Sequence, residues 1–154
     1  MKPSKQMCLF LLAGVSFLSG CSGTRGTEKQ IGAYIEKNCA GRTSCVVNLR
    51  GATPFEWDKV FAFKYSVKHS EIEQAIGAKI TGYHELRRYL IFTKAGAVVH
   101  SEDEPTNVEH PIKNEVVFAM PDSASYQEYG IDTSFTVSQE SSEAGPYYLL
   151  QPRK

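Results

Sequence analysis

The sequence lacks an excess of charge of either sign. Its 17 basic and 17 acidic side chains cancel, and the sequence pI is near 6.9. Nucleic-acid-binding proteins need a positively charged surface, and a basic protein partner would favour an acidic tail. Neither is present, so we expect no nucleic-acid partner. With 42% hydrophobic and 22% charged residues, the composition is that of an ordinary globular domain.

The sequence also lacks the short motifs of common enzymes. It contains no GxSxG nucleophile elbow, no HExxH zinc motif, no glycine-rich phosphate loop and no aligned Cys and His pair. Arg87 and Arg88 adjoin a strand and are expected to face solvent. A group of possible metal ligands fits no known spacing and is interpreted as a solvated polar loop: His100, Glu102, Asp103, Glu104, Glu109 and His110. We therefore expect no enzymatic activity, no metal and no cofactor.

No hydrophobic run is long enough to cross a membrane permanently. The run from Met7 to Leu18 has about 12 residues, whereas a membrane-spanning helix needs about 20. The basic residues Lys2 and Lys5 precede it and small residues follow it. This order of basic, apolar and small residues predicts a signal peptide over residues 1–20.

The residues that end this segment, Leu18-Ser19-Gly20-Cys21, resemble the lipobox of bacterial lipoproteins. The resemblance implies cleavage before Cys21 and acylation of that cysteine, with each buried CH₂ contributing about 0.8 kcal/mol to membrane binding. An ordinary secretory signal with an incidental cysteine is the alternative. Ser22, rather than Asp, follows the cysteine, which by resemblance to enterobacterial lipoproteins implies an outer-membrane anchor facing the periplasm rather than an inner-membrane one. We expect a lipidated tether over 21–26 and a single periplasmic domain over 27–154.

Cysteine is scarce in the expected domain. Cys8 leaves with the signal peptide and Cys21 takes lipid, so Cys39 and Cys45 remain. An oxidising compartment favours a disulfide between them, and their short loop predicts a stabilisation of about 2 kcal/mol. A redox or metal pair would need closer spacing or further ligands nearby.

Two stretches with helical spacing precede a series of strands. Helices are expected from residue 27 to about 38–41 and over 71–76, each near a capping-box sequence, with Gly77 ending the second. Residues 102–105 are expected to form a turn or exposed loop. Alternating patterns predict strands over 45–49, 59–65, 83–92, 97–101, 115–120, 135–137 and 147–150. This order predicts an α+β fold, a mainly antiparallel sheet with the two short helices packed on one face.

The segment Pro54-Phe55-Glu56-Trp57-Asp58 is the most distinctive part of the domain. It resembles a Pro-Phe-x-Trp-Asp signature of small, poorly characterised enterobacterial lipoproteins of the YafY and YfjS kind. In that family a short helix with a terminal Gly and a strand pair with a Leu-hydrophobic-Phe segment follow, which residues 70–77 and 90–92 match. The resemblance covers roughly residues 45–120. It implies an envelope location and a fold, and it carries over no enzymatic activity.

Trp57 has two interpretations. A large aromatic side chain beside a hydrophobic strand is usually buried, and Asp58 would then cap a turn. Alternatively, Trp57 and Asp58 are exposed and form a patch that binds a partner. We favour the buried Trp57.

The expected function is that of a non-enzymatic envelope lipoprotein. Acyl chains on Cys21 would attach it to the membrane, and its domain would bind another envelope protein in a structural or stress-related role. The alternative is a periplasmic immunity or inhibitor lipoprotein that blocks a toxin or hydrolase, for which a preformed patch and nanomolar binding are expected. A lipid-anchored hydrolase is a third, minor possibility.

Overall fold

The computed structural model describes residues 26–105 and 110–153. The expected signal peptide and the lipidation site Cys21 lie outside the described residues and stay predictions. No helix in the described part of the chain is long and apolar enough to span a membrane. Its elements are α1 (Thr27–Cys39), β1 (Ser44–Asn48), the 3-10 helix η1 (Leu49–Ala52), β2 (Lys59–Phe63), α2 (His69–Ile76), β3 (Arg87–Lys94), β4 (Ala97–Pro105), β5 (Val116–Phe118), β6 (Tyr126–Gly130), β7 (Ser134–Ser142) and β8 (Gly145–Pro152).

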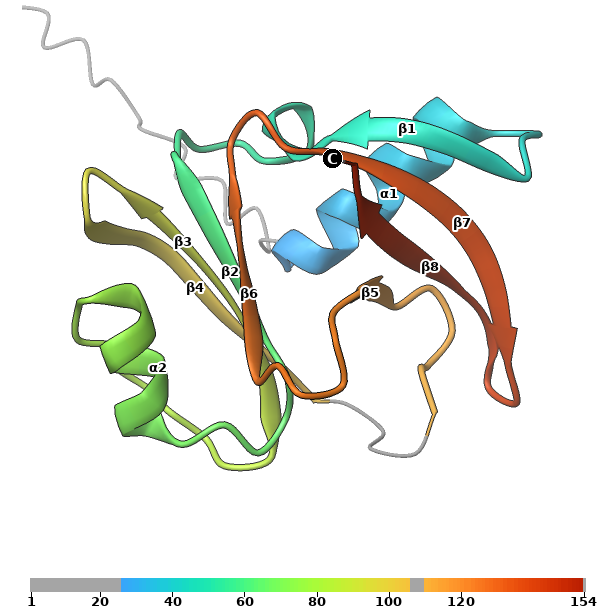
Figure 1. Ribbon diagram of the computed structural model, residues 1–154. Coiled ribbons are helices and arrows are strands. Elements are labelled where there is room, and N and C mark those ends of the chain that lie inside the picture. The colour runs from blue at the N-terminus through green and yellow to red at the C-terminus, as the bar shows by residue number, and fades with distance from the viewer. Residues whose placement is uncertain (1–25, 106–109, 154) are drawn as a thin grey trace, which may run out of the picture.

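The strands form two four-stranded sheets (Figure 1). The first sheet has the order β1-β7-β8-β5, and the second has the order β4-β3-β2-β6. Among the described strands, all pairs are antiparallel except β5, which runs parallel to β8 with Val116 opposite Tyr148. The predicted α+β class with mainly antiparallel pairing is confirmed. One sheet was expected, whereas the strands divide between two.

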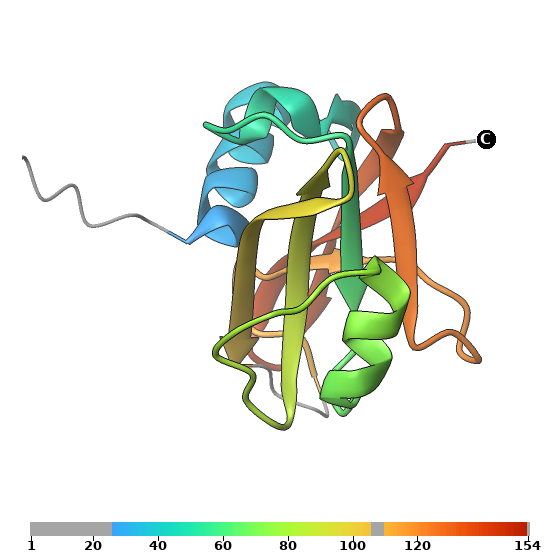
Figure 2. The same cartoon turned by 90° about the vertical axis from the view of Figure 1, so that its left-hand side faces the viewer.

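The two helices lie on opposite faces of the second sheet, and not on one face as the sequence predicts (Figure 2). Ile31 and Ile35 of α1 join the core cluster that contains residues of both sheets. Ile72 and Ile76 of α2 join a separate cluster on the outer face of the second sheet. The physical reason lies in β2, whose residues 60–63 are all apolar and buried. Because successive strand residues point to opposite faces, both faces of the sheet need an apolar cover.

The helix ends differ from the predicted capping boxes. Gly26 is the N-cap of α1, and no side chain caps that end. Instead, the Thr27 amide donates to the carboxylate of Glu102 at 2.5 Å, 75 residues later in the chain. The N-cap of α2 is Lys68, two residues before the expected Ser70. Gly77 ends α2 in the left-handed conformation, at φ 70°, as predicted.

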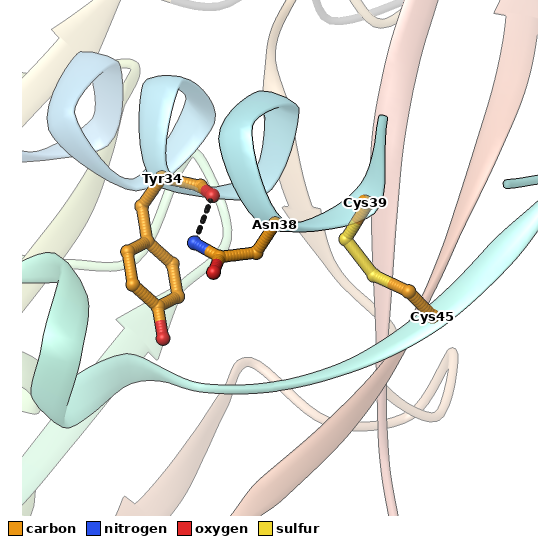
Figure 3. The surroundings of a disulfide bond; sticks show 4 residues. All are labelled: Tyr34, Asn38, Cys39 and Cys45. Atoms are coloured by element: carbon orange, nitrogen blue, oxygen red, sulfur yellow. Dashed lines mark hydrogen bonds between the residues drawn. A yellow bond between two sulfur atoms is a disulfide. The ribbon is translucent and has the colours of Figure 1, made fainter. Parts of the chain in front are cut away.

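Cys39 and Cys45 are joined and link the end of α1 to β1 (Figure 3). Their Cα atoms lie 5.6 Å apart, within the usual range for a disulfide. The Asn38 side-chain amide donates to the Tyr34 carbonyl at 2.7 Å and closes the last turn of α1. The connection between the first helix and the first strand is the one that the sequence predicts.

Strand β4 is longer than expected. It continues to Pro105, so residues 102–105 form strand and not a turn, and β3 begins at Arg87 and not at residue 83. The pairing with β3 explains the length, since Leu90 lies opposite Glu102 and Arg88 lies opposite Glu104. Backbone pairing with a buried neighbour outweighs the low strand propensity of consecutive acidic residues.

Candidate functional site

Trp57 is part of the core. Its side chain is 4% exposed, and its indole N–H donates to Thr53 Oγ1 at 2.9 Å. The indole ring meets Phe92 edge to face, with centroids 5.3 Å apart. The buried interpretation is therefore confirmed, and the interpretation of Trp57 as a partner surface is wrong because the side chain belongs to the core cluster and is covered by it.

Asp58 is exposed, but its hydrogen bonds give it a structural task. Its carboxylate accepts from the Ala95 amide at 2.7 Å, in the turn between β3 and β4. Its own amide donates to the Thr93 carbonyl, and its carbonyl accepts from the Ile131 amide. Asp58 thus fastens the β3–β4 turn to β2 and does not form a patch with Trp57. A partner surface has to be sought elsewhere.

A cavity of about 420 Å³ lies between the second sheet and β5. Its walls are mostly apolar, with Ala62 and Leu90 on one side and residues 116–120 on the other. Glu28, Arg88 and Glu104 lie at one end. A mostly apolar hollow with a few polar groups is the usual form of a ligand site. We name the charged group the acidic end; it comprises the cavity residues Glu28, Arg88 and Glu104, together with their contact residues Glu102 and Glu115.

Strand β4 brings a row of polar side chains to this region. His100, Glu102 and Glu104 alternate along the strand, so they share its inner face. Asp103 points the other way and contacts His84 at 3.0 Å. Sequence reasoning placed these residues in a solvated loop, and that interpretation is wrong for residues 100–104 because they belong to a paired strand. His110 lies outside the strands and is exposed, as that interpretation expects. The spacing of His100, Glu102 and Glu104 at every second residue could have predicted that they share one face of a strand.

The possible metal ligands considered in the sequence do not gather in one place in the described residues. Within residues 26–105 and 110–153, no three His, Cys, Asp or Glu side chains are placed to hold a metal ion. His110 contacts Glu143, at 3.9 Å, and Glu109 lies outside the described residues. The chemistry of the polar side chains on β4 is therefore set by their protonation and their ion pairs.

Arg88 is not solvent facing as expected, because it points from β3 into the acidic end. Its side chain is 20% exposed and forms ion pairs with Glu28 at 3.1 Å and with Glu115 at 2.8 Å. It also donates to the Val116 carbonyl at 3.2 Å. Arg87 has the more exposed side chain, as alternation along a strand requires. Sequence reasoning treated the two arginines alike, although only one of them can face outward.

Glu28 links α1 to the edge of β5. Its carboxylate accepts from the Val116 amide at 2.9 Å and from the Arg88 guanidinium. Burial raises the pKa of Glu28 above its usual value, although Arg88 and the Val116 amide oppose that rise. Together, Glu28 and Arg88 satisfy the Val116 backbone groups that face away from β8.

Glu102 and Glu104 share a proton. Burial and the hydrogen bond to Glu102 raise the pKa of Glu104 to about 8. Burial acts to raise the pKa of Glu102, but hydrogen bonds from Glu104 and the Thr27 amide help to lower it overall. Glu102 Oε1 is buried, and no N–H group or hydroxyl reaches it in the described residues. The proton of Glu104 therefore serves this oxygen, and the pair carries one negative charge near neutral pH.

The chain passes close to this pair at Gly26. A Cβ atom at position 26 would lie 2.2 Å from Glu102 Oε1 and 3.2 Å from Glu104 Oε1. Such a side chain could not be placed without moving a carboxylate. Gly26 thus allows the carboxyl pair to lie against the start of α1.

One contact at the acidic end has the components of a nucleophile and a base. Thr27 Oγ1 lies 2.8 Å from His100 Nε2. However, Glu102 contacts the same Nε2 atom, at 3.4 Å, so it does not orient the ring from the opposite nitrogen as in a catalytic triad. Thr27 is 2% exposed and its hydroxyl is out of reach of a substrate. This contact fastens α1 to β4.

Comparison of the chain with protein-family models, curated proteins and solved structures finds no match. The resemblance of residues 54–58 to enterobacterial lipoproteins stays a prediction. The cavity and its acidic end are the features from which function has to be argued.

Proposed function

We propose that this protein is a lipid-anchored lipoprotein of the bacterial envelope, without enzymatic activity of its own, whose domain binds another envelope protein. The observation that carries the proposal is the apolar cavity between the second sheet and β5. Cavities of this kind bury part of a ligand, while their few polar groups fix its orientation. The lipobox-like residues 18–21 supply the expected anchor in the outer membrane.

The charges at the acidic end support binding rather than structure alone. Four carboxylates gather there around Arg88, which forms ion pairs with Glu28 and Glu115. Buried carboxylates are costly unless they are paired, and the Glu102–Glu104 pair has only a shared proton and hydrogen bonds. Glu28 and Glu115 are paired with Arg88, whereas Glu104 has no cationic partner among the described residues, and a positively charged group of a partner would supply one.

The anchor is tested by replacing its cysteine. We expect Cys21→Ser to abolish incorporation of labelled palmitate, while the matched change Cys8→Ser leaves incorporation intact. Equal labelling of the wild type and Cys21→Ser would refute lipidation at this residue.

Partner binding is tested by photo-crosslinking in intact cells. A photoreactive residue at position 117, inside the cavity, should yield a discrete adduct with an envelope protein, and one at the exposed position 79 after α2 should not. Filling the cavity by Ala119→Phe should remove the adduct at 117 while the protein stays folded by circular dichroism. No adduct at 117, or equal adducts at both positions, would refute binding in the cavity. An adduct with a toxin or hydrolase that the purified domain blocks at nanomolar concentration would favour an immunity protein.

A further inference from the structure

We infer that the cavity receives an extended polypeptide segment of the partner that carries an Arg or Lys side chain beside apolar ones. This inference rests on the proposed function and specifies its partner. Three features of the cavity carry it: the charge of the acidic end, the apolar walls and the edge of β5 that faces away from β8. Each restricts the occupant in a different way.

The charge selects a cationic group. Arg88 is held by Glu28, Glu115 and the Val116 carbonyl, so it is not free to neutralise Glu104. Among the described residues, Glu104 forms no ion pair with a cationic side chain. A guanidinium or ammonium group at this position would replace the shared proton as the partner of the carboxylates. A fatty acid or a phosphate would instead meet like charge.

The walls select apolar groups next to that cation. Ala62 and Leu90 face residues 117–120 across the cavity, and these residues include no charged side chain. Lys64 and Asp122 also line the cavity, and Lys64 Nζ donates to the carbonyls of Pro121 and Asp122. Long basic side chains commonly lay an apolar stem along such a surface while the charged head meets polar groups. A lone inorganic cation would leave these walls uncovered.

The edge of β5 selects an extended backbone. Glu115 and Ala119 bond to β8 on one side of the strand, so alternation turns the backbone groups of Val116 and Phe118 the other way. Glu28 and Arg88 bind the Val116 groups from that side, and both line the cavity. The Phe118 groups continue the same edge. An extended segment can therefore bond to the Phe118 groups, beside the Val116 groups that Glu28 and Arg88 already hold, as in other complexes formed by strand addition.

Binding of a cation is expected to be linked to the release of a proton. The groups that face Glu104 are Glu28 from α1, Arg88 from β3 and Glu102 from its own strand, with His100 and Glu115 behind them. Because the pKa of Glu104 lies near 8, a cationic probe must displace a proton below that pH. The affinity of a cationic probe should therefore rise as the pH increases from 6.5 to about 8 and then level off. A variant of Glu104 tests whether this carboxyl group carries the pH dependence.

The experiment uses the full chain, purified from membranes in an uncharged detergent, and a fluorescently labelled, end-capped peptide Val-Leu-Arg-Leu-Val. Its comparators carry citrulline or Glu in place of Arg, or a methyl group on every backbone nitrogen. We expect at least tenfold weaker binding of the citrulline and Glu peptides and at least fivefold weaker binding of the methylated one. Glu104→Gln should weaken the Arg peptide about tenfold and remove its pH dependence. Glu85→Gln, in the exposed loop before β3, is the matched control and should change neither.

The outcomes separate the inference from the proposed function. Equal binding of the Arg and Glu peptides would overturn the charge argument, and equal binding of the methylated peptide would overturn strand addition. Decylamine that competes as strongly as the Arg peptide would show that the ligand is a small amphiphilic amine. No peptide binding with an intact adduct at position 117 would overturn this inference alone. The absence of both peptide binding and the adduct at position 117 would overturn the proposed function as well.

Discussion

The two faces of the second sheet differ in how completely they are covered. On the outer face, α2 packs Ile72 and Ile76 against an apolar cluster that includes Phe61 and Ile91. On the inner face, the apolar packing around Trp57 and Phe92 gives way to the cavity and its acidic end. The same strands contribute to both faces. The comparison teaches that the strand residues that point to the outer face stabilise the fold, while those that point to the inner face also provide the candidate site.

Strand β3 shows this division most clearly. Tyr89 and Ile91 are buried on the outer face, in the cluster under α2. Leu90 and Phe92 are buried on the inner face, but Arg88 on that face enters the acidic end. A charged residue is tolerated on the inner face because carboxylates from three other parts of the chain surround it. On the outer face, Arg87 at the start of the strand contacts Asp103 at 3.8 Å, and the residues that follow it under α2 are apolar.

The largest effect is expected at the apolar end of the inner face. Trp57→Ala should lower the free energy of unfolding by about 3 to 5 kcal/mol, because it empties a well-packed aromatic site. Urea denaturation followed by circular dichroism measures the change. Ile72→Ala, on the outer face, should cost about 2 to 5 kcal/mol by the same mechanism. A Trp57→Ala variant as stable as the wild type would show that the indole is not a core side chain.

Removal of Arg88 tests the charged end of the same face. Arg88→Met should cost about 3 kcal/mol at pH 7, since it leaves the carboxylates of Glu28 and Glu115 buried without their cation. The loss should shrink as the pH falls, because burial raises the pKa of Glu28 and its carboxyl group then takes up a proton. Arg87→Met, on the more exposed side of β3, should cost less than about 1 kcal/mol and serves as the control. Equal losses in the two variants would contradict the different roles assigned to the two arginines.

The disulfide should make a smaller contribution to stability, and neither cysteine lines the cavity. We expect the double change Cys39→Ala and Cys45→Ala to cost about 2 kcal/mol, mainly through the greater freedom of the unfolded chain. Thermal unfolding of the two proteins measures the difference, and alkylation without reductant should find no free thiol at these positions in the wild type. Unchanged peptide binding by the folded double variant would confirm that the disulfide lies outside the site. Two reactive thiols in the unreduced wild type would contradict the disulfide.

The smallest effect is expected from the shared proton. Glu104 holds its proton in the folded state to a pH of about 8, well above its usual pKa of 4.5. Stability from the protonated carboxyl is therefore present below about pH 4.5 and is lost as the pH rises through 8. Glu104→Gln keeps a hydrogen-bond donor without this loss, so its gain over the wild type should grow by about 1 kcal/mol between pH 5 and pH 8.5, allowing for solvent screening. A stability difference between the two proteins that does not change with pH would rule out the shared proton.

Local sequence patterns predicted the elements that depend on local interactions. The alternation of residues 59–63, the Gly77 helix end and the link between Cys39 and Cys45 are all present in the structure. The patterns did not predict that Glu102 would be strand, because its conformation is imposed by pairing with Leu90. They also could not reveal that Glu102, and not Thr27, satisfies the start of α1, since those residues lie 75 positions apart.

The candidate site was beyond sequence reasoning for the same reason. Its groups come from α1, β3, β4 and the residue before β5. The spacing of Glu28, Arg88 and Glu115 in the sequence does not indicate that these side chains are in contact. The residues that are most distinctive in the sequence, Trp57 and Asp58, lie in the core and beside the β3–β4 turn, and neither belongs to the candidate site. Alternation of His100, Glu102 and Glu104 was visible, but a cluster of charges is more often a solvated segment.

Gly26, which admits the carboxyl pair to the start of α1, also fixes how far the site can be from a membrane. If Cys21 carries the anchor, the chain from Cys21 to Gly26 can extend at most about 18 Å. Glu104 lies beside Gly26, so the acidic end would be held within about two nanometres of the lipid headgroups and could not sweep freely through the periplasm. A partner in the same membrane would then meet the cavity at a high effective concentration. Under this geometry, a modest affinity measured in solution is sufficient for stable association on the membrane, and lengthening the tether would weaken it without changing a single contact.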